Sequence, residues 1–313
     1  MITGKEKCFV SAVVYLHDNE GEITGFLREL YRVLHTNFEN FEVVCVNDFS
    51  SDQTVSVIRD FVAKSERFML SIINMSYFHG LELSMNAGVD IAIGDFVFEF
   101  DSACRDFPPE IIMRIYLRTL EGYDIVSASP DMVRATSKFF YHVFNRNSHS
   151  YFKLRTESFR ILSRRAVNRA HSISSTLPYR KAIYASSGLK MDFICYKRTA
   201  GDVHNTAERN AGARTAQAVE TLVLFTDIAY KISLILTLIM VSITLFTGGY
   251  TLFVYFGRHA AIAGWTTIML FLSAAFFGVF LILAIVIKYL SMLMELVFKK
   301  QKYFVESIEK ITN

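Results

Sequence analysis

The sequence predicts an α/β domain with a mainly parallel sheet, followed by two membrane-spanning helices that form a hairpin. Through the first two thirds of the 313 residues, short apolar runs alternate with stretches of helical periodicity. Repeated strand–helix units favour a parallel sheet with helices on both faces. Two long segments without charge follow, at 232–256 and 260–287. Each exceeds the roughly 20 apolar residues that span a bilayer.

Five strands are expected, because each is a short apolar or β-branched run bounded by polar residues. They cover residues 9–16, 41–46, 68–73, 95–100 and 124–128. The helix after the first strand carries one buried face, formed by Ile23, Phe26, Leu27, Leu30 and Leu34.

Further helices are expected after the second, third and fourth strands. The one after the second strand carries Val55, Ile58 and Val62, and the next covers 81–93. The helix after the fourth strand opens at Pro108-Pro109, a favoured residue type for a first helical turn.

The stretch GDFVFEFDSACRDFPPE, residues 94–110, marks the expected ligand site. Its apolar run delivers Asp101 to the carboxyl end of a strand, where open α/β sheets bind their ligands. Asp48 follows the second strand in the same way. For Asp52, capping of the next helix is as good an interpretation as ligand binding.

Residues 137–196 have weaker periodicity and many aromatic and basic side chains. We expect most of the aromatic residues to belong to an amphipathic helix that packs on the sheet. Guanidinium groups match phosphate geometry, so Arg160, Arg164, Arg165 and Arg180 are candidates for binding anionic groups near a membrane. A solvated polar face is the competing interpretation for each of them.

The charge pattern around the two apolar segments predicts their orientation. Only Arg258 lies in the short turn between them, whereas Lys231, Lys288, Lys299, Lys300 and Lys302 flank them on the other side. The positive-inside rule then places both chain ends in the cytoplasm. We therefore expect a cytoplasmic domain at 1–199, an amphipathic juxtamembrane connector at 200–230, two spans within 231–290 and a cytoplasmic tail at 291–313.

Composition argues against several other classes. The net charge is +3 and no basic stripe is interleaved with aromatic residues, so nucleic acid is not an expected partner. The four cysteines are scattered, without metal-ligand spacing, and fit buried thiols in a reducing compartment. The charged start MITGKEKCFV runs directly into a strand, which does not fit a signal peptide.

Several motifs resemble those of the family 2, GT-A-fold glycosyltransferases, in particular the polyprenyl-phosphate glycosyltransferases of the GtrB and dolichyl-phosphate mannose synthase type. VNDFSSDQT is similar to the family's VDDGSxDxT, and DSACRDFPPE to its DADLQDPPE. RNAGARTAQ resembles RxAGxSKY, and GWTTIMLF resembles the opening of the second span. The order and spacing of these motifs, which run nearly end to end, carry the resemblance.

The chain departs from the family at positions close to the donor. The family's DxD appears as Asp101-Ser102-Ala103, and the following Gln is Arg105. Phe49 stands in place of a Gly, and Phe78 in place of an Asn. In relatives the two carboxylates and the Gln hold Mg²⁺ or Mn²⁺, which neutralises the donor diphosphate. Only Asp101 remains as a metal ligand, so we expect Arg105 to replace the ion in part or in whole.

The resemblance implies a set of site residues. Those expected at the nucleotide sugar are Tyr15, Asp18, Asp48, Asp52, His79, Gly80, Asp101 and Ser102. The expected catalytic residues are Asp101, Arg105 and Glu157. Those expected at the lipid phosphate are Arg160, Arg164, Arg180, Arg209 and Arg214.

The resemblance also implies the reaction. We expect an inverting, membrane-bound enzyme of the bacterial inner membrane that moves one hexose from a nucleotide sugar, UDP-linked by preference, to undecaprenyl phosphate. The product would feed glycosylation of surface polysaccharides such as O-antigen, and relatives are often tetramers. The alternative is a degenerate pseudoenzyme that binds nucleotide or lipid or scaffolds a partner, as Phe49 and Ala103 suggest.

Overall fold

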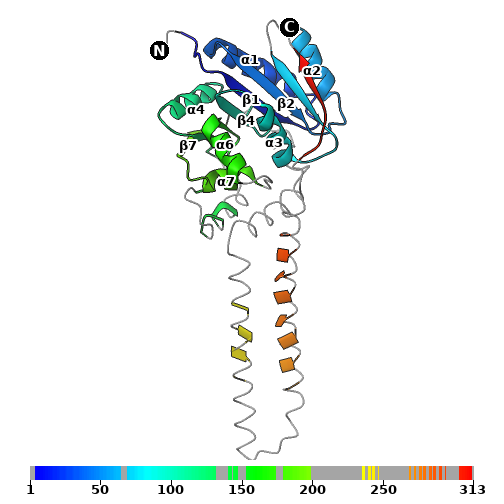
Figure 1. Cartoon of the computed structure of the whole chain (residues 1–313), viewed down its shortest axis with the longest axis vertical. Helices are drawn as coiled ribbons and strands as arrows, with labels where there is room; N and C mark the ends of the chain where they lie inside the picture. Colours follow the sequence, from blue (N-terminus) through cyan, green and yellow to red (C-terminus); the bar gives the residue numbers. More distant parts are fainter. Residues whose placement is uncertain are drawn as a thin grey trace, which may run out of the picture. The chain divides into compact units, whose positions relative to one another are not determined.

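The chain divides into two compact units, Met1–Thr221 with Gln301–Asn313, and Leu222–Lys300. A computed structural model describes residues 4–64, 69–131, 140–142, 144–146, 153–173, 179–198 and 303–311, together with separate helical positions between 235 and 293. The first unit is an α/β domain built on one sheet (Figure 1).

The sheet has eight strands in the order β7-β5-β6-β4-β1-β2-β3-β8. Its strands are β1 (Val10–Leu16), β2 (Phe41–Asn47), β3 (Leu70–Met75), β4 (Phe96–Phe100), β5 (Ile125–Pro130), β6 (Phe159–Ser163), β7 (Met191–Tyr196) and β8 (Val305–Ile311). β1 pairs in parallel with β2 and β4, and β2 with β3. β6 runs antiparallel to β4 and β5, and β8 antiparallel to β3. The expected mainly parallel α/β sheet is confirmed.

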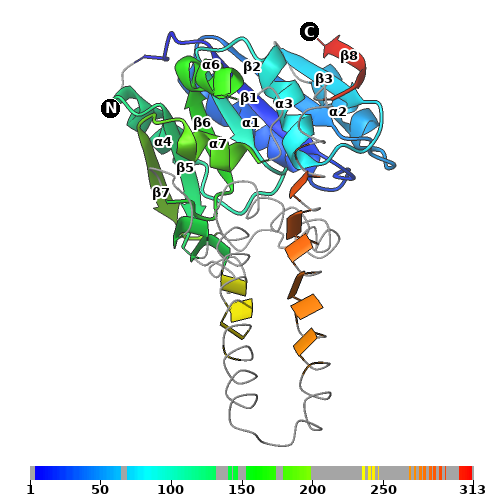
Figure 2. The ribbon, with the colours of Figure 1, turned by 60° about the horizontal axis from the view of Figure 1, so that its bottom comes forward.

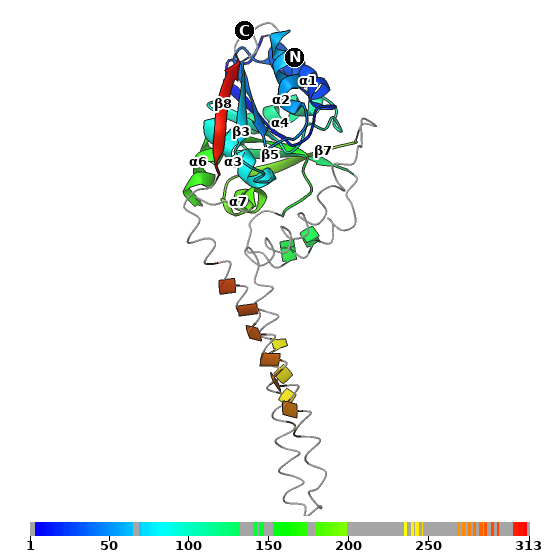
Figure 3. The same cartoon turned by 90° about the vertical axis from the view of Figure 1, so that its right-hand side faces the viewer.

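Helices cover both faces of the sheet (Figure 3). The described helices of this unit are α1 (Ile23–Asn37), α2 (Thr54–Ala63), α3 (Leu81–Ile91), α4 (Glu110–Leu120), α6 (Arg164–Ile173) and α7 (Arg180–Ser186). On one face, α1, α2 and α4 bury their apolar sides against β1, β2 and β4. On the other, a Cβ on Gly88 of α3 would lie only 2.3 Å from Val13 Cγ1, so glycine lets α3 approach β1 closely.

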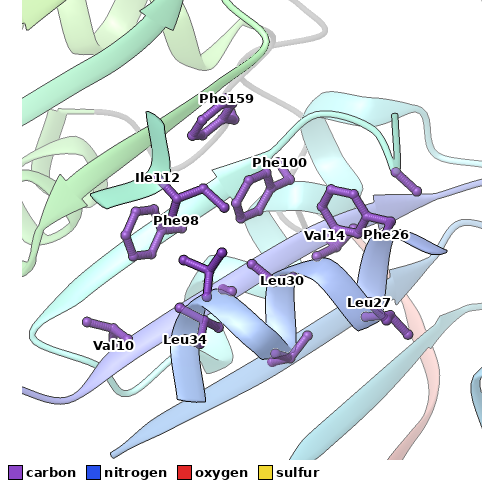
Figure 4. Close-up of a cluster of buried hydrophobic side chains, with 14 of the residues drawn as sticks. Val10, Val14, Phe26, Leu27, Leu30, Leu34, Phe98, Phe100, Ile112 and Phe159 are labelled. Carbon is purple, nitrogen blue, oxygen red and sulfur yellow. The ribbon is translucent and has the colours of Figure 1, made fainter. Parts of the chain in front are cut away.

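The main hydrophobic core lies between α1, α4 and the middle of the sheet (Figure 4). The five apolar residues expected on the buried face of α1 are all buried. Phe100 packs edge-on against Phe26, with ring centroids 5.3 Å apart, and stacks on Phe159 at 5.0 Å. The odd and even positions of β4 therefore face different sides, with Phe98 and Phe100 in this core.

The five expected strands are found as β1 to β5, with ends shifted by one or two residues. β6 and β7 differ from expectation, because they lie in the region 137–196 where an amphipathic helix was expected. The buried Arg160, second residue of FRILS, interrupts the apolar run of β6, so the hydrophobic pattern does not predict this strand.

Part of the segment expected as a C-terminal tail, Val305–Ile311, is a strand of the sheet. β8 pairs with β3 along the sheet edge (Figure 2). The Ser76 amide donates to the Phe304 carbonyl at 3.1 Å. Arg59 makes two hydrogen bonds to Glu309, at 3.0 and 2.8 Å, and Asn74 donates to the same carboxylate at 2.9 Å. The edge of β3 is thereby covered, which removes an open template for pairing with other chains.

The connector expected at 200–230 and most of both expected spans lie outside the described residues. Where the second unit is described, its residues are helical, and a Cβ on Gly278 would meet the side chain of Met240. None of the helices in the described portion of the chain has the length and hydropathy needed to cross a bilayer.

The turn after β2 contains a strained residue. Phe49 has φ of 55° and its side chain is exposed, with 56% of the residue accessible. A left-handed conformation costs a residue with a Cβ about 1–2 kcal/mol, and glycine avoids this cost.

We predict that the free energy of unfolding of Phe49→Gly is about 1 kcal/mol higher than that of Phe49→Ala. Both variants remove the ring, but only glycine removes the strain. Thermal unfolding of the purified chain measures the difference, and an equal or higher stability of the Ala variant would contradict it.

The contacts of β8 predict the effect of two matched substitutions. Glu309 accepts three hydrogen bonds, whereas Glu306 is exposed and its side chain has no hydrogen bond or ion pair among the residues that the structure describes. We expect Glu309→Ala to lower the free energy of unfolding by about 1 kcal/mol, because a bidentate arginine pair loses its partner. Glu306→Ala should change it by less than about 0.5 kcal/mol. Equal effects in denaturant titrations would show that β8 does not hold the sheet edge in this way.

Candidate active site

At the carboxyl edge of the sheet, Asp48 connects the end of β1 with the loops that follow β2 and β3. Its Oδ2 atom accepts hydrogen bonds from the Tyr15 hydroxyl at 2.9 Å and the Gly80 amide at 2.8 Å. Its Oδ1 atom accepts from the His79 amide at 2.8 Å. We call these four residues, Tyr15, Asp48, His79 and Gly80, the Asp48 cluster. The structure therefore brings together four residues that the sequence analysis assigned to the nucleotide sugar.

Both oxygens of the Asp48 carboxylate are engaged within the protein. The residue is completely buried, and both of its oxygens accept hydrogen bonds from the protein. A carboxylate with these partners positions the surrounding loops, and a contact of Asp48 with the base or ribose stays a prediction. Burial, followed by the nearby charge of Asp48, raises the pKa of the Tyr15 hydroxyl far above its ordinary value, so the phenol stays protonated as a donor.

Asp18 and Asp52 also bind backbone of the same loops. Asp18 Oδ1 accepts from the Ser51 amide at 2.7 Å. Asp52 Oδ1 accepts from the Thr54 amide at 3.0 Å at the start of α2, and its Oδ2 accepts from the Glu20 amide at 3.0 Å. Asp52 therefore binds backbone at the start of α2, although the N-cap residue is Gln53, whose side chain makes no capping bond.

His79 connects the Asp48 cluster to the C-terminal strand. Its Nε2 atom accepts from the Phe304 amide at 3.1 Å, so the neutral ring carries its proton on Nδ1 and donates it to the Tyr77 carbonyl at 2.6 Å. The ring also stacks on Tyr77, with centroids 4.0 Å apart. The segment that follows the second apolar stretch thus contacts the loop that contains His79 and Gly80.

A second group of charged side chains lies on the opposite face of β4 from the hydrophobic core. Side chains alternate along a strand, so Glu99 and Asp101 share the face that Phe98 and Phe100 do not use. The antiparallel register places Arg160 of β6 directly across from Glu99. We call the full group the ion cluster: Glu82, Glu99, Asp101, Glu157, Arg160, Arg180 and Lys181.

Arg160 has all of its hydrogen-bonding groups directed at carboxylates. Its Nε atom donates to Glu157 at 3.0 Å, Nη1 to Glu99 at 2.7 Å and Nη2 to Asp101 Oδ2 at 3.0 Å. The side chain is completely buried. A buried charge is tolerated only when it is paired and hydrogen-bonded, and these three contacts meet that condition.

Arg180 repeats this arrangement from α7. Its Nε atom donates to Glu82 at 2.9 Å and Nη2 to Asp101 Oδ1 at 3.0 Å, while Nη1 lies 3.0 Å from Glu99 Oε2. The Tyr184 hydroxyl donates to the other oxygen of Glu99 at 2.8 Å. The two arginines hold Asp101 from both sides.

Asp101 is the member of the ion cluster whose carboxylate is the most accessible, with 14% of its side chain exposed. Burial by itself would raise the pKa of Asp101, but the charges of Arg160, Lys181 and Arg180 outweigh burial and lower the pKa to about 2. Asp101 therefore remains ionised at neutral pH, and its position at the strand end agrees with a role at the donor.

The residues around Asp101 do not fit a divalent cation. Mg²⁺ and Mn²⁺ require oxygen ligands, and Ala103, where relatives carry the second carboxylate, offers none and is buried. Each oxygen of Asp101 already lies 3.0 Å from a guanidinium nitrogen. Throughout the described residues, no group of three His, Cys, Asp or Glu side chains is placed to hold a metal.

Three arginines expected at the lipid phosphate have other partners. Arg160 and Arg180 are completely buried in the ion cluster, so in this structure their guanidinium groups face carboxylates and not solvent. Arg164 donates to the carbonyls of Gly94 and Ala92, at 3.0 and 2.8 Å. Arg209 and Arg214 lie outside the described residues.

Arg105, Glu157 and Ser102 are the other residues expected at the site. Arg105 is exposed, and its guanidinium carbon lies 2.9 Å from where a Cβ on Gly25 of α1 would be. The cations that reach Asp101 are instead Arg160, Arg180 and Lys181. Glu157 is buried as a partner of Arg160, and Ser102 is partly buried next to Asp101.

Sequence analysis did not identify Glu82, Glu99 or Lys181 as site residues. For Glu99 a signal existed, because a carboxylate inside the apolar run FVFEF, two residues before Asp101, must share its face. Glu82 and Lys181 reach the site through α3 and α7, and nothing in their local sequence indicates it.

The fold is similar to that of solved glycosyltransferase structures. The mannosyltransferase from Pyrobaculum calidifontis, in complex with GDP-Man and Mn²⁺, has a TM-score of 0.52 and 15% identity over 70% of this chain and 63% of its own. Glucosyl-3-phosphoglycerate synthase from Mycobacterium tuberculosis, in complex with Mn²⁺, UDP and phosphoglyceric acid, has a TM-score of 0.50 and 13% identity over 69% of this chain and 78% of its own. The domain is of the GT-A type.

Relatives in sequence are also glycosyltransferases. An uncharacterized glycosyltransferase of Synechocystis sp. is 29% identical over 60% of this chain, and the match spans only 61% of that protein's length. A prophage bactoprenol glucosyl transferase homolog of Escherichia coli K12 is 26% identical over 86% of this chain and 88% of its own. The bactoprenol glucosyl transferase of Shigella phage SfV is 29% identical over 65% of each chain.

The sequence model of the family described as Glycosyl transferase family 2 matches residues 11–187, which is more than half of the chain. The match begins in β1 and ends just after α7, so it includes the Asp48 cluster and the whole ion cluster. The chain belongs to glycosyltransferase family 2.

Proposed function

We propose that this protein transfers a single hexose, glucose in the first instance, from a UDP-linked donor to undecaprenyl phosphate at the cytoplasmic leaflet of the bacterial inner membrane. The observation that carries the proposal is Asp101, held ionised at the carboxyl edge of a family 2 sheet next to the loops of the Asp48 cluster. Relatives named bactoprenol glucosyl transferases, which match up to 86% of this chain, support the choice of acceptor and sugar.

The chemistry requires a nucleophile, a leaving group and stabilisation of developing charge. The second pKa of a phosphate monoester lies near 6, so the acceptor is largely a dianion at neutral pH and needs no strong general base. One of its oxygens forms the bond to the anomeric carbon while the bond to the β-phosphate of the donor breaks. The electron pair of that bond leaves with UDP, and the configuration at the anomeric carbon inverts.

Different residues of the site would have different roles in this reaction. The Asp48 cluster fixes the loops that receive the nucleotide, with the Tyr15, His79 and Gly80 positions set by one buried carboxylate. Asp101 would orient the donor at the strand end. Fixed charges in a site that excludes water stabilise a transition state without reorganisation, and the arginines of the ion cluster give Asp101 that rigidity.

The apolar segments 232–256 and 260–287 would form a hairpin that keeps the site at the membrane, with both chain ends in the cytoplasm. Arg209 and Arg214 of the connector at 200–230 would then lie next to anionic headgroups and the acceptor phosphate. Assembly into a homo-oligomer belongs to the same proposal.

The proposal predicts transfer by the purified full-length chain. Incubated in detergent with undecaprenyl phosphate and radiolabelled UDP-glucose, the protein should produce a labelled lipid that mild acid hydrolyses to glucose. We expect Asp101→Asn to lower the rate by about 100-fold or more, the size of effect seen when one preorganised electrostatic group is removed. Glu306→Ala, which changes an exposed residue of β8, should leave the rate unchanged and serves as the matched control.

The same assay with a panel of other nucleotide sugars shows whether the protein uses a donor other than UDP-glucose.

Ala103 and the strained, exposed Phe49 favour a second candidate function, a pseudoenzyme that binds the nucleotide without turning it over. Nucleotide binding without labelled lipid from any donor would support that candidate and contradict the transferase.

A further inference from the structure

Lys181 differs from the two arginines of the ion cluster. Arg160 and Arg180 each engage three carboxylates and are completely buried. Within the described residues, Lys181 makes one contact with a carboxylate, at 3.7 Å between Nζ and Asp101 Oδ2, and no hydrogen bond. An ammonium group carries three donors. Lys181 therefore has donors to offer to another anion.

The ammonium of Lys181 lies at the accessible end of the ion cluster. Its side chain is 11% exposed and that of its partner Asp101 is 14% exposed, whereas the side chains of Glu99 and Arg160 are completely buried. Burial opposes the charged form, but the neighbouring Tyr141, Asp101 and Glu157 outweigh it and raise the pKa of Lys181. A lysine that stays charged while largely desolvated interacts strongly with an anion, because the local dielectric is low.

The ammonium of Lys181 lies beside Asp101, the carboxylate expected at the donor. Ala103 offers Asp101 no second carboxylate, and three cations lie within 4 Å of the Asp101 carboxylate. Arg160 and Arg180 are each matched by carboxylates, whereas among the described residues Lys181 pairs with Asp101 alone, so its ammonium is the charge in this group that a further anion can contact. A diphosphate next to Asp101 would therefore meet a fixed ammonium.

We propose that Lys181 is a catalytic residue that binds the diphosphate of the nucleotide sugar and supplies the positive charge for which related enzymes use a divalent cation. The inference rests on the proposed function, since it assigns a role within the same donor site. It also replaces Arg105 as the residue expected to take over from the ion, because the guanidinium of Arg105 packs against Gly25 of α1.

The proposed step balances without a metal or a proton donor. The bound donor carries two negative charges on its diphosphate, and UDP leaves with one more as the bond to the anomeric carbon breaks. Lys181 would donate hydrogen bonds to the oxygens of the departing phosphate, and these charge-assisted bonds strengthen as the charge develops. Asp101 keeps the ammonium in place through their existing contact.

Calorimetric titration of the full-length protein with UDP, in EDTA and separately in Mn²⁺, tests the proposal. For the unmodified protein we expect the two dissociation constants to agree within about twofold. Lys181→Met keeps the length of the side chain without its charge, and should weaken UDP binding in EDTA by about 10- to 100-fold, the value of one charge-assisted hydrogen bond. Lys181→Arg keeps the charge and should retain most of the affinity.

Lys190→Met is the matched control, because Lys190 is exposed and lies beside the first residue of β7, at the opposite end of the strand from the site. It should bind UDP like the unmodified protein. Thermal unfolding of each variant shows whether it is folded, and Lys181→Arg keeps the test decisive should Lys181→Met not fold.

The outcomes separate this inference from the proposed function. UDP binding that requires Mn²⁺, or Lys181→Met that binds UDP in EDTA as tightly as the unmodified protein, overturns the role of Lys181 and leaves the transferase standing. The absence of UDP binding under both conditions overturns the role of Lys181 and the proposed donor together.

Discussion

The pairing of buried charge is the constraint on which the site depends. Three cations and four carboxylates lie on one face of β4 and β6, and most of them are removed from water. Taking one partner from such a group typically costs 3–5 kcal/mol, because the remaining charge is left uncompensated. The ion cluster is therefore arranged as a unit, and that unit fixes Asp101 at the edge of the sheet. Rigidity of this kind is what electrostatic catalysis requires.

Much of the fold follows from the hydrophobic pattern. The buried face of α1 and the strands β1 to β5 were predictable, because each element repeats apolar residues at its own period within a short window. β6 was not, since Arg160 interrupts its apolar run and is buried because Glu99, Asp101 and Glu157 pair with it. β8 was not either, because VESIEKI is a half-polar edge strand whose partner, β3, lies more than two hundred residues earlier.

The location of the site at the carboxyl edge of the sheet was predictable from the sequence, but the contacts within the site were not. Strand ends identify Asp48 and Asp101, and the two do lie at the carboxyl edge. Sequence shows where a carboxylate stands along the chain, but not whether its oxygens face a ligand or the amides of neighbouring loops. Asp48 faces amides and Asp101 faces cations. Lys181 comes from a short helix eighty residues away, and only the packing of α7 against β4 brings it to Asp101.

The central claim is that fixed cations, and not a metal ion, surround the donor diphosphate beside Asp101. An experimental structure of the full-length protein with UDP, prepared in chelator, tests it most directly. We expect a phosphate oxygen of UDP at hydrogen-bonding distance, about 3 Å, from the ammonium of Lys181. A diphosphate that lies away from Lys181, or one that is ordered only when Mn²⁺ bridges it to Asp101, would contradict the account.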